Sequence, residues 1–257
     1  MNQNTPSPVD TASFVGAKLK KSAQAGVLHE RRQCQIQGRA LEVQVFRPDT
    51  DQPAPGILYL HDIFGVLKVF EEDARELARL GYVVYLPNLF SGQAIRYCIR
   101  TLVTSSARNN AKDSPLLAEV FELLDLLKAE PTCNKRLGVL GQCLTGGFVI
   151  QSALRTDVDA PVIYHHSFGQ QGAGIPPKEQ GSLKSIETIQ GHWSSLPDPF
   201  CPAKRRDKLK SLLGDRLDDH TYPIPHGFRS SSRSTDSAQL AWKRTLEFFG
   251  EQLKPTS

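Results

Sequence analysis

The sequence of 257 residues is long enough to bury a substantial core and to form one large domain or two small ones. Its hydrophobic fraction (39%) and its charged fraction (23%) are typical of a globular protein. The formal net charge is +4, and the densest basic cluster, residues 204–210, lies in a predicted helix without interleaved aromatic residues. The sequence therefore predicts no nucleic-acid partner.

The cysteine content and the hydropathy indicate the cellular setting. Five cysteines, an odd number, occur without a CxxC pair and without metal-like spacing. The N-terminus has no apolar signal-peptide core, and no apolar run is long enough to span a membrane. We therefore expect a cytoplasmic protein with free thiols and no membrane partner, present as a monomer or a homodimer.

The first half of the chain predicts an arm followed by alternating strands and helices. Residues 1–25 are polar and lack strong periodicity, so they are predicted to form a loosely ordered arm before a single domain, residues 26–257. The domain begins with two short alternating strands, a buried strand, an amphipathic helix and a second buried strand, predicted at 34–37, 41–46, 56–60, 69–80 and 82–86. This succession predicts a parallel strand pair with a crossover helix.

The second half of the chain continues the alternation. Residues 88–110 are irregular, and a short helix is expected around 94–103. Further helices are predicted from Asp113 and over 146–154, 203–213 and 235–253, and further strands over 136–140, 161–164, 185–190 and 221–223. The pattern predicts one α/β domain with a mostly parallel, doubly wound sheet, whose functional site lies at the carboxyl ends of the strands.

The stretch Arg136–Phe148 predicts a strand, a tight turn and a helix, which is the geometry of a nucleophile elbow. The usual elbow is Gly-x-Ser-x-Gly. Here Cys143 stands at the position of the serine and Thr145 at that of the second glycine, with Gly146 and Gly147 behind it. An inert, buried cysteine beside a packing turn is the alternative interpretation of the same stretch.

A cysteine nucleophile needs a base and a residue that orients the base. Among the histidines after Cys143, His226 is preferred because it lies late in the chain, between a predicted strand and the final helix. Asp198, which follows the predicted strand 185–190, is the preferred acid. Four other aspartates are predicted to be solvated, in a helix or a charged turn: Asp207, Asp215, Asp218 and Asp219.

Several motifs together resemble the dienelactone hydrolase family (carboxymethylenebutenolidases and relatives) of the α/β-hydrolase superfamily, over residues 30–253. The motifs are the cysteine elbow, the His-Asp-Ile-Phe-Gly turn and four further segments, at 141–147, 61–65, 81–90, 198–202, 226–228 and 241–249. The resemblance implies an α/β-hydrolase fold and a cysteine hydrolase of small esters or lactones that uses no cofactor.

The resemblance also implies roles for single residues. Cys143 is the expected nucleophile, His226 the base and then the acid, and Asp198 the residue that orients His226. The backbone amides of Ile63 and Leu144 are the expected oxyanion hole, because two converging amides stabilise a tetrahedral intermediate.

Several residues of the expected site depart from the family pattern. In the family a carboxylate in the turn after the third strand contacts the resting cysteine. Asp62 stands there, one methylene shorter than the usual glutamate, and a structural cap on the turn is the alternative. An arginine that binds a substrate carboxylate in one branch has no aligned counterpart. The candidate pocket residues are Phe64, His165, His166 and Arg96. Two adjacent histidines also resemble a metal site, but no cysteine or acidic partner has suitable spacing, so no metal is predicted.

The leading hypothesis is a cysteine-dependent hydrolase of a small ester or lactone that works through an acyl-thioester. A general carboxylesterase or thioesterase with the same triad is an alternative within the enzymes. A non-catalytic binding protein on the same fold is an alternative from another class, because a fold does not determine a function.

Overall fold

The computed structural model describes residues 14–18, 26–90, 115–167, 181–183 and 185–253. The short helix predicted at 94–103, the predicted helix cap Asp113 and the candidate pocket residue Arg96 therefore lie outside the described residues. Within the described ranges, no helix is both long enough and apolar enough to cross a membrane.

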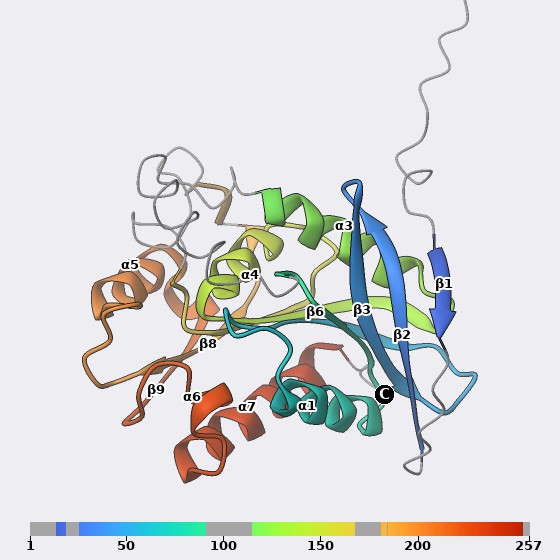
Figure 1. Cartoon of the computed structure of the whole chain (residues 1–257). Coiled ribbons are helices and arrows are strands. Elements are labelled where there is room, and N and C mark those ends of the chain that lie inside the picture. Colours follow the sequence, from blue (N-terminus) through green and yellow to red (C-terminus); the bar gives the residue numbers. More distant parts are fainter. Residues whose placement is uncertain (1–13, 19–25, 91–114, 168–180, 184, 254–257) are drawn as a thin grey trace, which may run out of the picture.

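A nine-stranded sheet forms the centre of the domain, in the order β1-β2-β3-β5-β4-β6-β7-β8-β9 (Figure 1). The three N-terminal strands pair antiparallel, and β3 pairs antiparallel with β5, whereas all later neighbours pair parallel. The mostly parallel α/β sheet is therefore confirmed. The strands are β1 (Phe14–Lys18), β2 (Val27–Ile36), β3 (Arg39–Pro48), β4 (Ala54–Leu60), β5 (Val83–Pro87), β6 (Cys133–Gln142), β7 (Ala160–Tyr164), β8 (Ile189–Ser194) and β9 (Leu217–Tyr222).

Helices cover both faces of the sheet, as a doubly wound fold requires (Figure 1). One face packs against α3 (Pro115–Ala129), α4 (Gly146–Ser152) and α5 (Ala203–Leu213). The other face packs against α1 (Lys68–Arg79), α6 (Phe228–Ser231) and α7 (Asp236–Leu253). Because both faces are covered, every residue of β4, β5 and β7 is buried, which explains their continuous apolar sequences.

The apolar residues of α1 show why this segment is helical and where it ends. Phe70, Ala74, Leu77 and Ala78 are buried and recur at the spacing of one helix face. Gly81, directly after the cap residue, has φ 94, a conformation that favours glycine and stops the helix. The helix therefore starts and ends close to the predicted limits of 69–80.

Four elements differ most from the prediction. The first strand, predicted at 34–37, is the longer strand β2, Val27–Ile36. The strand predicted at 185–190 is instead β8, Ile189–Ser194, so only 189–190 of the prediction is strand. The weak strand predicted at 221–223 is the full strand β9, so Asp218 and Asp219 lie in a strand and not in a charged turn. Within the predicted arm, Phe14–Lys18 forms β1 and pairs with β2.

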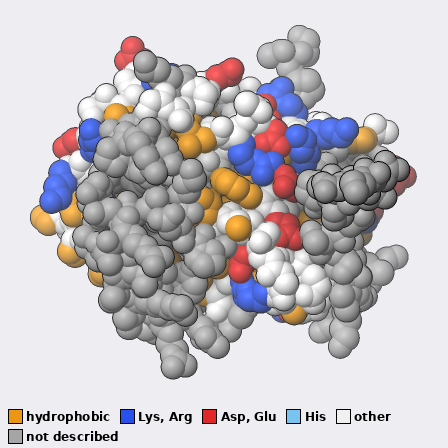
Figure 2. All heavy atoms as spheres, turned by 90° about the horizontal axis from the view of Figure 1, so that it is seen from above, with side chains coloured by type: hydrophobic (Ala, Val, Ile, Leu, Met, Phe, Trp, Pro, Cys, Tyr) orange, Lys and Arg blue, Asp and Glu red, His pale blue; other side chains and the backbone are white. Residues whose placement is uncertain are grey.

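The face seen from above in Figure 1 carries Lys and Arg side chains next to Asp and Glu side chains (Figure 2). Hydrophobic side chains lie in its central part, between regions drawn in grey (Figure 2). Ion pairs such as Arg39–Glu119 and Arg155–Asp125 neutralise charges of the described part of the chain. Mixed charges of this kind are poorly suited to hold an extended polyanion.

Strand register brings distant segments to the same edge of the sheet. Leu60 at the end of β4 pairs with Gly141 of β6. In the same way Gln142 pairs with Tyr164, and Ser194 pairs with Tyr222. The turns that follow these pairs leave the sheet side by side at its carboxyl edge, where the site of an open α/β sheet forms.

Candidate active site

The elbow around Cys143 has the predicted strand, turn and helix. Cys143 directly follows β6 and opens a 3-10 turn, Cys143–Thr145, which runs into α4. Its φ of 56 lies in the left-handed region, which a non-glycine residue rarely adopts. Such strained residues concentrate at functional sites, where the surrounding structure holds them.

Two glycines allow the elbow to pack closely. A Cβ at Gly141 would lie 2.6 Å from Cγ2 of Val149 and 2.8 Å from the carbonyl oxygen of Thr145. A Cβ at Gly146 would lie only 1.9 Å from the carbonyl oxygen of His165. The start of α4 therefore approaches both its own strand and β7 more closely than any side chain allows.

Thr145, at the position of the second glycine in the usual elbow, joins the elbow to the turn after β4. Its buried hydroxyl accepts a hydrogen bond from the Gln142 amide at 2.9 Å. The hydroxyl also lies 3.2 Å from the carbonyl oxygens of both Leu60 and His61, to which it can donate. The single hydroxyl proton goes to one acceptor at a time, and the Gln142 carbonyl oxygen at 2.9 Å competes with the other two. The threonine thus caps the elbow turn and lies in polar contact with the end of β4.

The two candidate oxyanion amides occupy equivalent positions on neighbouring strands. Leu60 and Gly141 are paired, and Ile63 and Leu144 each come three residues beyond that pair. Leu144 is buried behind Cys143, whereas Ile63 is partly exposed. Both residues thus follow neighbouring strands at the same edge of the sheet, and the oxyanion hole formed by their amides stays a prediction.

Asp198 and His226 meet at the same edge. Each comes four residues after the paired residues Ser194 and Tyr222. The Nδ1 atom of His226 lies 2.6 Å from Oδ2 of Asp198. The other oxygen, Oδ1, accepts hydrogen bonds from the amides of Phe200 and Cys201 at 2.9 and 3.0 Å. Both carboxylate oxygens of Asp198 are thus held in fixed roles.

The electrostatics of the pair follow from this geometry. Burial opposes the ionisation of Asp198, but the hydrogen bonds from His226 and from the Cys201 amide lower its pKa to about 2. Burial also opposes protonation of His226, but the bond to Asp198, together with the neighbouring Cys143 thiol, raises the pKa of His226 to about 9. A histidine of this kind can carry a proton next to a cysteine near neutral pH.

Cys143 is partly exposed, whereas Cys34, Cys133 and Cys201 are buried. Burial is the main cause that raises the pKa of each of these three thiols, that of Cys201 to about 11. Cys98 lies outside the described residues. Among the described cysteines, Cys143 therefore has the environment of a reactive thiol and the others that of inert core residues.

Asp62 lies in the turn that carries Ile63. It is 2% exposed, and its Oδ1 accepts a hydrogen bond from the Phe64 amide at 2.9 Å. Burial raises the pKa of Asp62, against the opposing effects of the Phe64 amide and the Ser230 hydroxyl. These contacts fit the alternative of a structural cap on the turn.

The candidate pocket residues fall in different environments. Phe64 is 67% exposed beside Ile63. His166 is fully buried, and its Nδ1 accepts a hydrogen bond from Trp193 Nε1 at 3.3 Å. It is therefore a hydrogen-bonded interior residue. Sequence reasoning missed Phe200, which is 62% exposed and whose ring lies 5.4 Å from that of His226. Its place two residues after Asp198 was the available signal.

His165 contacts the candidate triad directly. Its ring lies 4.3 Å from that of His226 at an angle of 32°, and its Nδ1 lies 3.6 Å from Oδ2 of Asp198. Burial, followed by the nearby charge of His226, lowers the pKa of His165 well below its usual value. One ligand atom from each of His165, Asp198 and His226 lies within 4.8 Å of the others, a possible metal-binding group that the chain spacing alone did not reveal.

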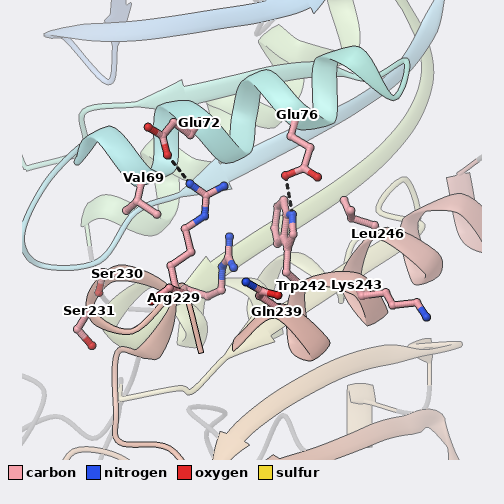
Figure 3. A pocket seen from close by; sticks show the side chains of 12 residues that line it. Val69, Glu72, Glu76, Arg229, Ser230, Ser231, Gln239, Trp242, Lys243 and Leu246 are labelled. Atoms are coloured by element: carbon pink, nitrogen blue, oxygen red, sulfur yellow. Dashed lines mark hydrogen bonds and ion pairs between the residues drawn. The ribbon is translucent and has the colours of Figure 1, made fainter. Parts of the chain in front are cut away.

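The segment after His226 is anchored by a buried ion pair. Arg229 of α6 pairs with Asp73 of α1, and both side chains are almost fully buried. Asp73 also accepts a hydrogen bond from Tyr59 at 3.0 Å, and the Arg229 guanidinium lies 4.4 Å from the ring of Trp242. A cavity of about 740 Å³ borders this anchor between α1, α6 and α7 (Figure 3), and Cys143 is not among its lining residues.

The mostly parallel sheet, the helices on both faces and the elbow at the carboxyl edge define an α/β-hydrolase. The family model of the dienelactone hydrolase family matches residues 41–253. The chain is 28% identical to carboxymethylenebutenolidase 1 of Cupriavidus pinatubonensis over 82% of this chain and 91% of that protein. It is 27% identical to the carboxymethylenebutenolidase of Rhodococcus opacus over 77% of this chain and 81% of that protein.

The fold is likewise similar to solved structures. A putative dienelactone hydrolase from Klebsiella pneumoniae superposes with a TM-score of 0.72 and 21% identity, over 88% of this chain and 100% of that chain. The chain therefore belongs to the dienelactone hydrolase family, and it is a hydrolase that acts on ester or lactone bonds.

Proposed function

We propose that the protein is a cysteine-dependent hydrolase of small esters or lactones, with Cys143 as nucleophile, His226 as base and acid, and Asp198 as the residue that orients His226. The observation that carries this proposal is the hydrogen bond between His226 and Asp198 at 2.6 Å next to a partly exposed cysteine in a strained elbow. The imidazolium formed by proton transfer from the thiol would be stabilised by Asp198.

The proposed reaction has two steps. The Cys143 thiolate attacks the carbonyl carbon, and the oxyanion that forms is held by the amides of Ile63 and Leu144. Collapse breaks the carbon–oxygen bond, the leaving oxygen takes the proton from His226, and an acyl-thioester remains on Cys143. His226 then removes a proton from water, the hydroxide attacks the thioester, and the acid leaves while the proton returns to the cysteine.

The choice of nucleophile predicts the kind of substrate. A thiolate is a good leaving group, so the first tetrahedral adduct reverts unless the alcohol part leaves easily. The alcohol part of an enol lactone leaves as a stabilised enolate, and that of an aryl ester leaves as a phenolate. An alkyl ester or an amide has no such leaving group. Two exposed rings, Phe64 next to Ile63 in the chain and Phe200 at 5.4 Å from the His226 ring, favour an apolar or aromatic substrate.

The proposal also bears on the setting of the protein. The nucleophile must be a free thiol, which suits a reducing compartment such as the cytoplasm. The binding-protein alternative is disfavoured because the strain at Cys143 and the two-sided hold on Asp198 have no role in passive binding.

Turnover of five substrates separates the functions. We expect hydrolysis of an enol lactone and of an aryl acetate, weak hydrolysis of the matching ethyl ester and none of the amide, all abolished in Cys143→Ala. Mass spectrometry of the quenched reaction should show an acyl adduct on Cys143. Equal turnover by Cys143→Ala would exclude this cysteine, and ligand binding without turnover would support a binding protein. Preference for an acyl-thioester substrate over both oxygen esters would support the thioesterase alternative.

A further inference from the structure

His165 is a buried histidine whose ring nitrogens form no hydrogen bond with any residue that the structure describes. The residue is 1% exposed, and within the described ranges neither Nδ1 nor Nε2 forms a hydrogen bond. Buried polar atoms are almost always paired, so an exception in a native site requires an explanation. The backbone at His165 also has φ 57, in the left-handed region. The ring therefore keeps its position despite two unfavourable features, the unpaired ring nitrogens and the left-handed backbone.

The unpartnered ring faces a convergent set of ligand atoms. Its Nδ1 lies 3.6 Å from Oδ2 of Asp198, the same oxygen that is 2.6 Å from Nδ1 of His226. In a tetrahedral zinc site with bonds of roughly 2.0–2.2 Å, neighbouring ligand atoms are roughly 3.3–3.5 Å apart. The first separation lies about 0.1 Å above this range, and the second must open by less than about 1 Å. The ligand atoms of His165 and His226 lie within 4.8 Å of each other.

We propose that His165, Asp198 and His226 form an inhibitory binding site for Zn²⁺ or a similar transition-metal ion. Two imidazoles and one carboxylate are a preferred ligand set for zinc, whereas Mg²⁺ and Ca²⁺ prefer sites built from oxygen atoms. Water would supply the fourth ligand of such a site. Hydrolysis by the proposed triad needs no contact from His165, so the metal site accounts for a residue that the proposed function leaves unexplained.

The consequence of metal binding is reversible inhibition. A metal bound to Nδ1 of His226 displaces the proton shared with Asp198 and uses the oxygen that orients the ring. The imidazole can then no longer exchange a proton with the thiol of Cys143. Metal binding is measured without substrate. The protein can therefore fail to bind zinc and still be a cysteine hydrolase, or bind zinc and not be one.

Zinc binding is measured by competition with a chromogenic zinc chelator, using the full chain. We expect one tightly bound zinc per chain, loss of esterase activity at the same zinc concentration, recovery with EDTA, and no effect of Mg²⁺. In His165→Asn, zinc affinity should fall at least tenfold; asparagine suits the left-handed backbone at this position. His220→Asn is the matched control, because His220 forms a second histidine–aspartate pair, with Asp218 at 2.8 Å, and should bind zinc as the native protein does.

A further variant keeps the test decisive if His165→Asn does not fold. Cys143→Ala should retain the zinc affinity, because the cysteine supplies none of the three ligands. Loss of zinc binding in Cys143→Ala would overturn the proposal in favour of a site centred on the thiol. Unchanged affinity in folded His165→Asn, or absence of stoichiometric zinc binding by the native protein, would also overturn it.

Discussion

Replacement of Asp198 by asparagine tests the candidate triad most directly. The carboxylate fixes the tautomer of His226, since Oδ2 faces Nδ1 of the ring at 2.6 Å. Oδ1 is held by the amides of Phe200 and Cys201, so the asparagine oxygen is expected to take that place. The asparagine NH₂ group would then face Nδ1 and force the ring proton onto Nε2. In that tautomer the nitrogen facing Cys143 cannot accept the thiol proton.

The size of the effect follows from the pKa of His226. Its rise from 6.5 to about 9 opposes burial and depends first on Asp198 and then on Cys143. A net rise of 2.5 units at about 1.36 kcal/mol each gives about 3.4 kcal/mol, or roughly 300-fold, as the order of magnitude of the charge stabilisation that Asp198 and Cys143 together provide beyond the opposing effect of burial. The wrong tautomer adds to this loss, so we expect kcat to fall by about 10²- to 10⁴-fold.

The pH dependence of stability and activity is a second, independent test of the Asp198–His226 contact. A raised pKa means that the bond to Asp198 stabilises the folded protein fully below about pH 6.5 and that this contribution is lost as the pH rises through about 9. In Asp198→Asn the pKa of the imidazole should fall clearly below about 9, because its largest stabilising contact is lost and only Cys143 still opposes burial. The assays are kcat and kcat/KM against pH and an NMR titration of the imidazole.

The matched control is Asp218→Asn, which alters the other histidine–aspartate pair, with His220. It should leave kcat within about threefold of the native value, because Asp218 lies on β9 away from His226. The reasoning is refuted if Asp198→Asn keeps near-native kcat and its pH profile. A large loss in Asp218→Asn or Asp215→Asn instead would identify another carboxylate as the orienting residue.

Two further predictions concern the cysteines and the turn after β4. Brief iodoacetamide treatment followed by peptide mapping should label Cys143 first, because the other described cysteines are buried; faster labelling of Cys34, Cys133 or Cys201 would contradict the assignment. Asp62→Ala should lower the free energy of unfolding in urea by about 0.5–1.5 kcal/mol, whereas Asp62→Asn, which keeps an oxygen for the Phe64 amide, should stay near the native value. Equal losses in both variants would show that the charge matters and not the cap.

The sheet could be predicted where burial produces simple patterns. Strands β4, β5 and β7 are buried on both faces and are read directly as apolar runs, and α1 is read from its 3.6-residue spacing. The elbow was predictable because close backbone approach requires glycine at Gly141 and Gly146.

The last two strands were not predicted correctly because their sequences conflict with strand propensity. β8 contains Gly191, where a Cβ would lie 1.7 Å from the Trp193 ring, and His192, which bonds to Tyr222 and Gln190 inside the sheet. The polar residues of β9 pair with neighbouring side chains, as Asp219 does with Lys210. Polar residues satisfied by tertiary partners have no signature in a single sequence.

The choice of His226 and Asp198 rested on chain order, and the structure places them in contact, whereas the position of His165 could not be foreseen. The sequence pattern does not predict that a histidine after a strand will adopt the left-handed backbone conformation seen at His165. Its contact with the His226 ring, at a tilt of 32°, arises from the pairing of β6, β7 and β8, which no local pattern reveals. The same reason hid its approach to Asp198, since 33 residues separate the two in the chain.

The register also explains how two strained residues persist next to each other. Gln142 and Tyr164 are paired across β6 and β7, so Cys143 and His165, both with positive φ, come one residue beyond the same pair. The Ser167 amide donates to the Cys143 carbonyl at 2.9 Å, which ties the turn after β7 to the elbow. On the other side, the carbonyl of His165 fills the space that a side chain at residue 146 would need. The turn after β6 and the turn after β7 thus stabilise each other. The backbone conformation that exposes the Cys143 thiol and the one that buries His165 against Asp198 depend on the same contacts.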